Sequence, residues 1–326
     1  MDMWSGRVMR RAGSLVAALV LGLGLATAAS AAPVKCRVGA YIVSLSQVDT
    51  ATGVFKADFW MWSVCPTPEL EPLKTMEFLN GVQTTGSLDS TIRRGDQWWS
   101  TRKVSGTFRQ DFSLKNYPFD EQPLEIDIEE GVLDTRDLVY VADPRESGMD
   151  PTVDLPGWRL KDFRVLARIA DHPTTFGDPS LPGGSSQYAA LTLQVGVERA
   201  HLANFIKATF PLYIAALLAL VSLTVTDGRM SLLGTTTFAV VLSFVSVERV
   251  VGPHDGVYLL DQLHFAALAL IMAATGWGVI SLRAIAHGGD AVLQRRRDLR
   301  AAIWMTGGYL LLNLALVGRT IAVAGH

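Results

Sequence analysis

The chain has 326 residues, of which 49% are hydrophobic and 18% are charged, and its formal net charge is -2. This near-neutral balance argues against the basic surface by which proteins bind nucleic acid, so we expect no nucleic-acid partner. The length is sufficient for an exported domain together with several membrane spans.

The first residues have the composition of a secretory signal peptide. Basic residues precede an apolar run, and a small-residue cleavage sequence follows: Arg7, Arg10, Arg11, Leu15–Ala26 and Ala29-Ser30-Ala31. This order predicts a signal peptide over residues 1–31 and a mature chain that begins near Ala32 outside the cytoplasm. An uncleaved anchor is the alternative, but the apolar run is short for a membrane span.

Residues 33–199 show a pattern typical of short strands. Runs of β-branched and aromatic residues are separated by Gly, Pro, Asp and Asn, with no long helical period between them. The expected strands are Tyr41–Val48, Val54–Trp62, Leu124–Ile128, Phe163–Ile169 and Tyr188–Val197. We therefore predict that residues 32–200 form an all-β, immunoglobulin-like sandwich outside the cytoplasm.

Both cysteines, Cys36 and Cys65, fall in this exported region, where oxidation is permitted. They lie almost equally far from the turn Asp49–Gly53, so a hairpin folded there brings them opposite each other. Matching the side chains of Tyr41 and Met61 gives a strand register that differs by one residue from the register that pairs the two cysteines. The cysteine pairing and the Tyr41–Met61 pairing both hold only if a bulge lies between them. We predict a Cys36–Cys65 disulfide, with two buried thiols as the alternative.

After Arg199 the sequence becomes apolar, and four runs are long enough to span a membrane. They cover about 205–226, 230–247, 257–282 and 301–324, within an α-helical membrane domain at 201–326. The connection Arg283–Arg300 is rich in arginine, so the positive-inside rule places it in the cytoplasm. The prediction is a multi-pass protein of the cell (inner) membrane, with its N-terminal domain extracellular or periplasmic.

The second span is polar for a membrane segment. Five of its residues recur at alternating steps of four and three and therefore share one helical face: Ser231, Thr235, Phe238, Leu242 and Val245. Hydroxyl groups gain nothing from facing lipid, so we interpret this face as the lining of a pore. In the alternative, Thr235 and its neighbours Thr236 and Thr237 bond back to their own helix or to adjacent helices.

An exported β domain followed by four spans, the second of them pore-like, resembles the pentameric ligand-gated ion channels of the Cys-loop receptor superfamily. The segment Asn116–Gln122, with Tyr117-Pro118-Phe119-Asp120, is similar to their signature loop. It lacks the cysteines that close this loop in animal receptors, as the prokaryotic branch does. The other matching positions are Arg199, Pro211, Arg229, Pro253, Tyr258 and Asp261. The region after Trp62 departs from the family, because several strands are shortened or missing there.

The resemblance implies a homopentamer that sits in a lipid bilayer and conducts ions. It implies that Asp120 pairs with Arg199 at the junction between the outer domain and the pore, where a capping Asp and an interfacial Arg are the alternative. Further coupling residues implied by the resemblance are two in the signature loop and two in the outer turn: Pro118, Phe119, Pro253 and His254.

The pore interpretation assigns different tasks to the residues of the stripe. Apolar rings of Phe238, Leu242 and Val245 stop ions by losing water, whereas the Ser231 and Thr235 hydroxyls replace part of a hydration shell. Rings of carboxylates at the two mouths, Asp227 inside and Glu248 outside, predict cation selectivity. Arg229 and Arg249 would oppose this preference if they faced the lumen.

The agonist is expected to be a small molecule or protons. In the family it binds between subunits under the loop joining the last two strands, here Asp171–Ser186, and the candidate residues are Phe176, Tyr188, Glu77 and Arg136. Core aromatic residues beside a free loop are the alternative interpretation. His254, which titrates near neutral pH, leaves protons as a second candidate.

Two other classes of function stay open. A non-conducting, membrane-anchored sensor or binding module has no use for a stripe of hydroxyl and apolar residues. A membrane enzyme is not expected, because the sequence has no paired carboxylates with a nucleophile, no metal-ligand spacing and no Gly-rich phosphate loop. We therefore expect no cofactor and no metal.

Overall fold

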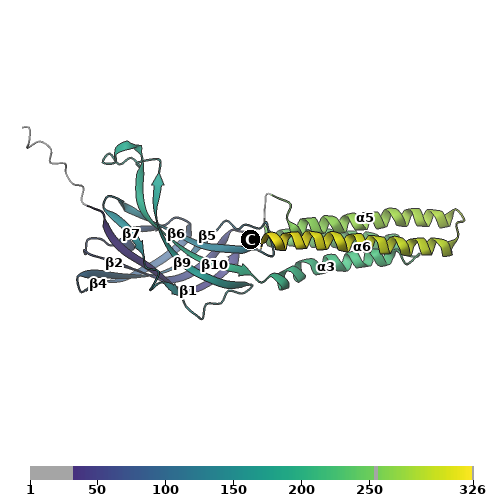
Figure 1. Cartoon of the computed structure of the whole chain (residues 1–326), viewed down its shortest axis with the longest axis horizontal. Helices are drawn as coiled ribbons and strands as arrows, with labels where there is room; N and C mark the ends of the chain where they lie inside the picture. Colours follow the sequence, from purple (N-terminus) through teal and green to yellow (C-terminus); the bar gives the residue numbers. More distant parts are fainter. Residues whose placement is uncertain (1–31, 253–255, 325–326) are drawn as a thin grey trace, which may run out of the picture.

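A computed structural model of the chain describes residues 32–252 and 256–324, so the predicted signal peptide at 1–31 lies outside the described residues. Figure 1 shows an elongated molecule, with a β-rich region at one end and long helices at the other. The change from strands to helices falls between Arg199 and His201, close to the predicted boundary at 200/201.

The β-rich region consists of two sheets. The larger one has the strand order β4-β5-β2-β1-β7, with β8 paired to β1, and the smaller one has the order β3-β6-β10-β9. Their strands are β1 (Val34–Asp49), β2 (Val54–Cys65), β3 (Met76–Phe78), β4 (Gly81–Arg94), β5 (Gln97–Arg109), β6 (Glu121–Asp134), β7 (Leu138–Ala142), β8 (Gly148–Met149), β9 (Trp158–His172) and β10 (Ser186–Arg199). All five predicted strands lie within this set, in β1, β2, β6, β9 and β10.

The two sheets share one hydrophobic core. Side chains alternate between buried and exposed along β2, and its inward residues Phe55 and Phe59 pack with Ile128 of β6 and Leu191 and Leu193 of β10. This packing leaves the second face of each sheet exposed, and that face of the smaller sheet carries polar side chains.

The sequence pattern missed most of the segment that follows β2. This segment forms the short helix α2 (Pro72–Thr75), then β3, and then the long hairpin of β4 and β5. Most described side chains of β4 are exposed, Val82 included, because β4 is the edge strand of its sheet. An edge strand with little burial has no alternation of apolar and polar residues by which a sequence reveals it.

The hairpin of β1 and β2 brings the two cysteines together. Arg37 pairs with Val64, and the adjacent Cys36 and Cys65 sulfur atoms form a disulfide with an S–S distance of 2.00 Å. Tyr41 faces Trp60, so the expected match of Tyr41 with Met61 is wrong. The ladder is irregular between Ile42 and Ser44 and again between Ser46 and Asp49, and these bulges account for the difference in register.

Removing this disulfide is expected to lower the free energy of unfolding by about 2 to 4 kcal/mol, because the bridge limits the conformations of the unfolded chain. The double variant Cys36→Ala/Cys65→Ala should unfold at a lower temperature than the wild-type protein in the same detergent. Wild-type protein treated with a reductant should behave as the variant does. Equal unfolding temperatures with and without the bridge would contradict the prediction.

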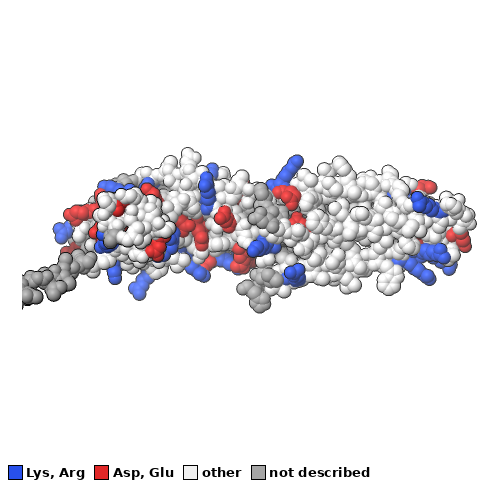
Figure 2. Space-filling view, turned by 90° about the horizontal axis from the view of Figure 1, so that it is seen from above, with Lys and Arg blue, Asp and Glu red and all other residues white. Residues whose placement is uncertain are grey.

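Four helices follow the β region: α3 (His201–Ser222), α4 (Arg229–Val251), α5 (Leu259–Ala286) and α6 (Ala291–Ala324). Each is long and apolar enough to cross a membrane, which indicates a multi-pass membrane protein. Figure 2 shows few charged side chains along the middle of this helical half. Such a surface suits contact with lipid.

The last helix begins at Ala291, earlier than the apolar run suggested. The carboxylate of Asp290 accepts hydrogen bonds from the backbone N–H groups of Val292 (2.8 Å) and Leu293 (3.3 Å), so Asp290 caps the helix. The segment predicted as a connection, Arg283–Arg300, is therefore mostly helical. Its arginines lie at the end of α5 and on the first turns of α6.

Candidate functional site

The predicted pore-lining residues share one face of α4. Ser231, Thr235, Phe238, Leu242 and Val245 are all exposed in the single chain, and Phe238 is 65% exposed. The opposite face of α4 packs against the other helices through Leu233, Thr236, Val240 and Ser243. A helix face that stays largely exposed within its own chain is available for a pore or for contact with other subunits.

The three threonines of α4 bond back to their own helix, as the alternative interpretation supposed. Thr235 Oγ1 donates to the carbonyl oxygen of Ser231 (3.0 Å), and Thr236 and Thr237 both donate to that of Leu233 (2.9 Å). These bonds use the hydroxyl proton, but the lone pairs of the exposed Thr235 oxygen stay available. The back-bonding is therefore compatible with a hydroxyl oxygen that faces ions.

The N-terminal end of α4 separates its acidic and basic residues. Asp227 is exposed in the turn before the helix, whereas Arg229 is buried and its Nη2 lies 2.8 Å from Oδ2 of Asp298 in α6. Arg229 thus lies away from the exposed stripe. At the C-terminal end of α4, Glu248 is half-buried and Arg249 is exposed.

The predicted pair of Asp120 and Arg199 is present where the β domain meets the helices. Arg199 Nε lies 2.7 Å from Asp120 Oδ1 and Nη2 lies 3.0 Å from Oδ2, a bidentate contact between side chains that are 10% and 2% exposed. Gln122 Nε2 donates to the same carboxylate at 2.8 Å.

Two aromatic rings enclose the guanidinium of Arg199. The guanidinium carbon Cζ of Arg199 lies 4.1 Å from the ring centre of Trp158 and 4.7 Å from that of Tyr117. Burial raises the pKa of the Tyr117 phenol. Trp158 was not among the predicted residues, because only the register of β9 against β10 places it beside Arg199. Tyr117 and Gln122 belong to the segment that resembles the signature loop, but the sequence pattern predicts no separate role for them.

Loops of the β domain touch the helices at two places. The ring of Phe119 lies 5.6 Å from that of Phe205 in α3, and Thr50 Oγ1 donates to the carbonyl oxygen of Val250 at 3.5 Å. Gly252, with φ of 87°, approaches Ala51 so closely that an added Cβ would lie 2.6 Å from its Cα. Pro118 belongs to the same loop as Phe119. The other two predicted coupling residues, Pro253 and His254, lie outside the described residues.

Three aromatic rings gather at the base of the loop between β9 and β10. The ring of His172 lies 5.2 Å from that of Phe176 and 6.0 Å from that of Tyr188. Nε2 of His172 is 2.6 Å from Oε1 of Glu129, whose Oε2 is buried without a hydrogen-bond partner among the described residues. Glu77 is the cross-strand neighbour of Glu129. We call these five residues the aromatic–acidic cluster.

Arg136 is occupied by another contact. Its guanidinium bonds Asp134 at 2.5 Å and reaches the carbonyl oxygen of Ser180 at 3.4 Å, so it fastens the base of the loop. This contact holds the pKa of the Asp134 carboxyl below its usual range. Among the predicted ligand residues, the structure thus brings Phe176, Tyr188 and Glu77 into the cluster and gives Arg136 a supporting contact.

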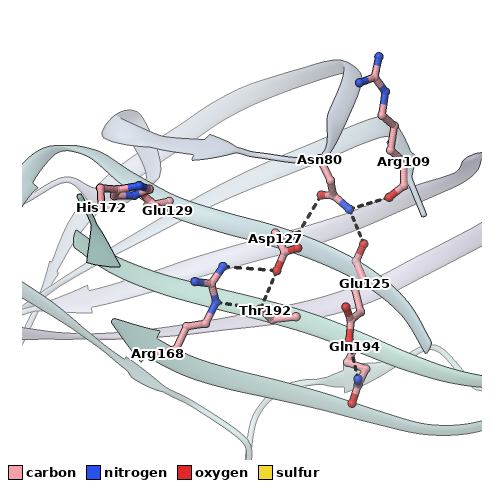
Figure 3. A network of polar contacts seen from close by, with 9 residues as sticks. All are labelled: Asn80, Arg109, Glu125, Asp127, Glu129, Arg168, His172, Thr192 and Gln194. Atoms are coloured by element: carbon pink, nitrogen blue, oxygen red, sulfur yellow. Dashed lines mark hydrogen bonds and ion pairs between the residues drawn. The ribbon is translucent and has the colours of Figure 1, made fainter. Parts of the chain in front are cut away.

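Polar contacts tie the strands of the smaller sheet together beside this cluster. Figure 3 shows Asp127 between Asn80 and the pair of Arg168 and Thr192, while Glu129 and His172 lie apart from them. Thr192 Oγ1 donates to Asp127 Oδ1 at 2.8 Å, and Arg168 Nη2 lies 3.6 Å from the same oxygen. These contacts fix the strands on which the cluster stands.

The larger sheet carries an open pocket of about 390 Å³ on its exposed face. Its lining combines aromatic rings with an arginine and two carboxylates: Arg37, Tyr41, Trp62, Val64, Trp99, Asp143 and Glu146. Asp143 holds the pocket wall by accepting from Trp62 Nε1 (3.3 Å) and contacting Arg37 Nε (3.3 Å).

Within residues 32–252 and 256–324, no group of three or more His, Cys, Asp or Glu side chains could hold a metal ion. The sequence matches no family model and no curated protein.

Proposed function

We propose that the chain forms a homopentameric ligand-gated ion channel in the cell (inner) membrane, with an immunoglobulin-like β domain outside. The observation that carries this proposal is the exposed stripe of α4, because a helix that keeps one hydroxyl and apolar face unburied suits a water-filled pore. Supporting it, the ion pair of Asp120 and Arg199 lies at the contact between the β domain and the helices. Motion of the β domain has a direct path through this contact to α3 and α4.

Cation selectivity follows from the charges at the inner mouth. Asp227 is exposed, whereas Arg229, the basic residue nearest to it, is buried and paired with Asp298. Five copies of an exposed carboxylate attract cations and repel anions.

We further propose that the agonist is a cation or a proton that binds at the aromatic–acidic cluster. Glu77 and Glu129 are directly opposite on neighbouring strands, and two like charges in this position destabilise the sheet. A bound cation relieves that repulsion, and the rings of Phe176 and Tyr188 offer their faces to it. The open pocket on the larger sheet of an adjacent subunit is suited to cover the other side of the ligand.

The decisive experiment measures current through purified protein in planar bilayers, after its mass in detergent has been determined. The expected result is a pentamer that conducts and whose opening depends on pH or on an added organic cation. Intact pentamers that stay silent at all pH values and under all cations tested would contradict the channel proposal and favour a non-conducting, membrane-anchored sensor.

Replacing Glu129 with Gln is expected to shift activation to higher agonist concentration by about tenfold, since the loss of about 1.4 kcal/mol of binding free energy has this effect. The probes are protons and tetramethylammonium, applied to the reconstituted protein. Glu125→Gln is the matched control, because Glu125 is on the same strand but bonds Gln194 at 2.7 Å instead of His172. Equal activation of both variants would place the agonist elsewhere.

A further inference from the structure

The ion pair of Arg229 and Asp298 is deeply buried at the inner end of the helices. The two side chains are 1% and 3% exposed, and Arg229 is the first residue of α4. A pair of opposite charges removed from water this completely is costly unless other polar groups surround it. The neighbouring elements show how each charge is held.

Asp298 is held by α5 and α6 independently of Arg229. Its carboxylate accepts from Trp277 Nε1 at 2.9 Å, Ser281 Oγ at 2.8 Å and Gln294 Nε2 at 3.1 Å, in addition to Arg229 Nη2 at 2.8 Å. Three donors therefore stay in place if the arginine is removed. The Asp298 carboxylate is therefore already in position to bind a cationic side chain.

Arg229, in contrast, depends on the Asp298 carboxylate to balance its charge. Its Nε donates to the carbonyl oxygen of Val225 at 2.7 Å and its Nη2 donates to that of Leu223 at 3.1 Å, but its Nη1 is buried without a partner among the described residues. Gly278 of α5 makes room for the side chain, because an added Cβ would lie 3.2 Å from Cδ of Arg229. Asp298 supplies the anion that balances the charge of Arg229 within this packing.

The helical geometry places this pair behind the proposed pore lining. Successive residues of an α-helix are about 100° apart, so Arg229 lies about 160° from Ser231, on the far side of α4 from the exposed stripe. Asp227 is exposed in the turn just before the helix. The two charged residues at the inner end of α4 are thus separated by direction as well as by burial.

We propose that Asp298 is a selectivity-determining residue of the channel, although it lies on α6 and lines no part of the exposed stripe. It neutralises Arg229 and keeps it behind α4, so that the field at the inner mouth is set by Asp227. This inference rests on the proposed channel function. Without the Asp298 carboxylate, a pentamer gains five net positive charges around its inner mouth.

Burial of Arg229 and Asp298 protects their charges from screening by salt. Salt screens exposed charges within about 8 Å at physiological ionic strength, but it screens buried charges much less. Removing Asp298 is therefore expected to oppose the carboxylate ring of Asp227 and to favour anions. Removing Arg229 leaves the carboxylate of Asp298 unbalanced and is expected to have the opposite effect.

The test is the reversal potential of reconstituted pentamers in a KCl gradient. The variants are Asp298→Asn, Arg229→Gln and the double variant, with Asp227→Asn as a reference for the loss of an exposed carboxylate. Asp290→Asn is the matched control, because Asp290 is an exposed carboxylate at the same end of α6 and Asn keeps its capping bond to Val292. Gel filtration verifies that each variant assembles.

The expected result is a several-fold fall in the ratio of potassium to chloride permeability for Asp298→Asn and a rise for Arg229→Gln. The double variant should return close to the wild-type ratio, and Asp290→Asn should leave it unchanged. If Asp298→Asn does not assemble, the rise in Arg229→Gln and its reversal in the double variant carry the test. Conducting wild-type channels whose ratio is unaffected by these variants overturn this inference alone. A wild-type pentamer that passes no current overturns the channel and this inference together.

Discussion

Replacing Asp120 with Asn is expected to destabilise the protein by about 3 to 5 kcal/mol, the usual cost when one partner of a buried ion pair is removed. The guanidinium of Arg199 would stay enclosed by the rings of Trp158 and Tyr117, with no carboxylate to balance its charge. The two hydrogen bonds of 2.7 Å and 3.0 Å would lose their charged acceptor. The measurement is thermal unfolding of the purified protein in detergent.

The same change is expected to abolish activation. Asp120 lies in the loop that also carries Tyr117 and Phe119, and these two rings pack against the helices near Phe205. Arg199 joins this loop to β10, the strand that continues into α3. Without the ion pair, the loop and its contact with Phe205 are no longer held to that strand. Recordings from reconstituted Asp120→Asn should show no agonist-evoked current at concentrations that saturate the wild-type protein.

Two variants separate this effect from a general loss of charge. Asp111→Asn removes an exposed carboxylate from the segment that leads to the same loop and should change neither stability nor current. Asp120→Glu keeps the charge and should recover part of both. Full activity and stability of Asp120→Asn would show that the ion pair contributes to neither activation nor stability, although it is buried.

The junction was predictable from the sequence only in part. Asp120 could be found because it belongs to a motif of adjacent residues, and Arg199 because it ends the last strand before an apolar run. Trp158 could not be found in this way, because it reaches Arg199 only through the pairing of β9 with β10. Cross-strand partners depend on register, which a pattern along one strand does not contain.

The aromatic–acidic cluster shows the same limit. Phe176 and Tyr188 lie within or next to one loop and could be predicted from it, but Glu129 joins His172 from a different strand. Arg136 illustrates the converse error, since its guanidinium is engaged by Asp134, only two residues before it. Proximity in sequence indicated the region of the site but not which charges are available to a ligand.

The start of α6 is set by polar contacts and not by the start of the apolar run. The fourth apolar run begins near Ala301, yet α6 begins at Ala291, because Asp290 caps it and Asp298 is buried in the helix packing by hydrogen bonds from α5 and by Arg229. A buried carboxylate inside an arginine-rich segment looks like part of a cytoplasmic loop when only composition is considered. Its partner is 69 residues away in the chain.

Replacing Phe238 with Ala is expected to raise the resting conductance of the channel by about tenfold or more, because lowering a permeation barrier by about 1.4 kcal/mol has that effect. Phe238 is the largest side chain of the exposed stripe and faces away from the other helices of its chain. In the proposed pentamer, five such rings would narrow the pore and exclude water, and alanine would widen the constriction so that ions keep their hydration. Single-channel recording without agonist measures the change directly.

The matched control is Phe244→Ala, the same substitution on another side of the same helix, about 120° from Phe238. Phe244 packs 5.5 Å from His264 and 5.9 Å from Phe265 of α5, measured between ring centres, so its loss should weaken helix packing. It should lower the unfolding temperature without opening the resting channel, whereas Phe238→Ala should do the reverse. If both variants changed conductance alike, or if Phe238→Ala left gating and resting current unchanged in a conducting channel, the exposed stripe would not line the pore. The exposed face of α4 would then be a surface for contact between subunits.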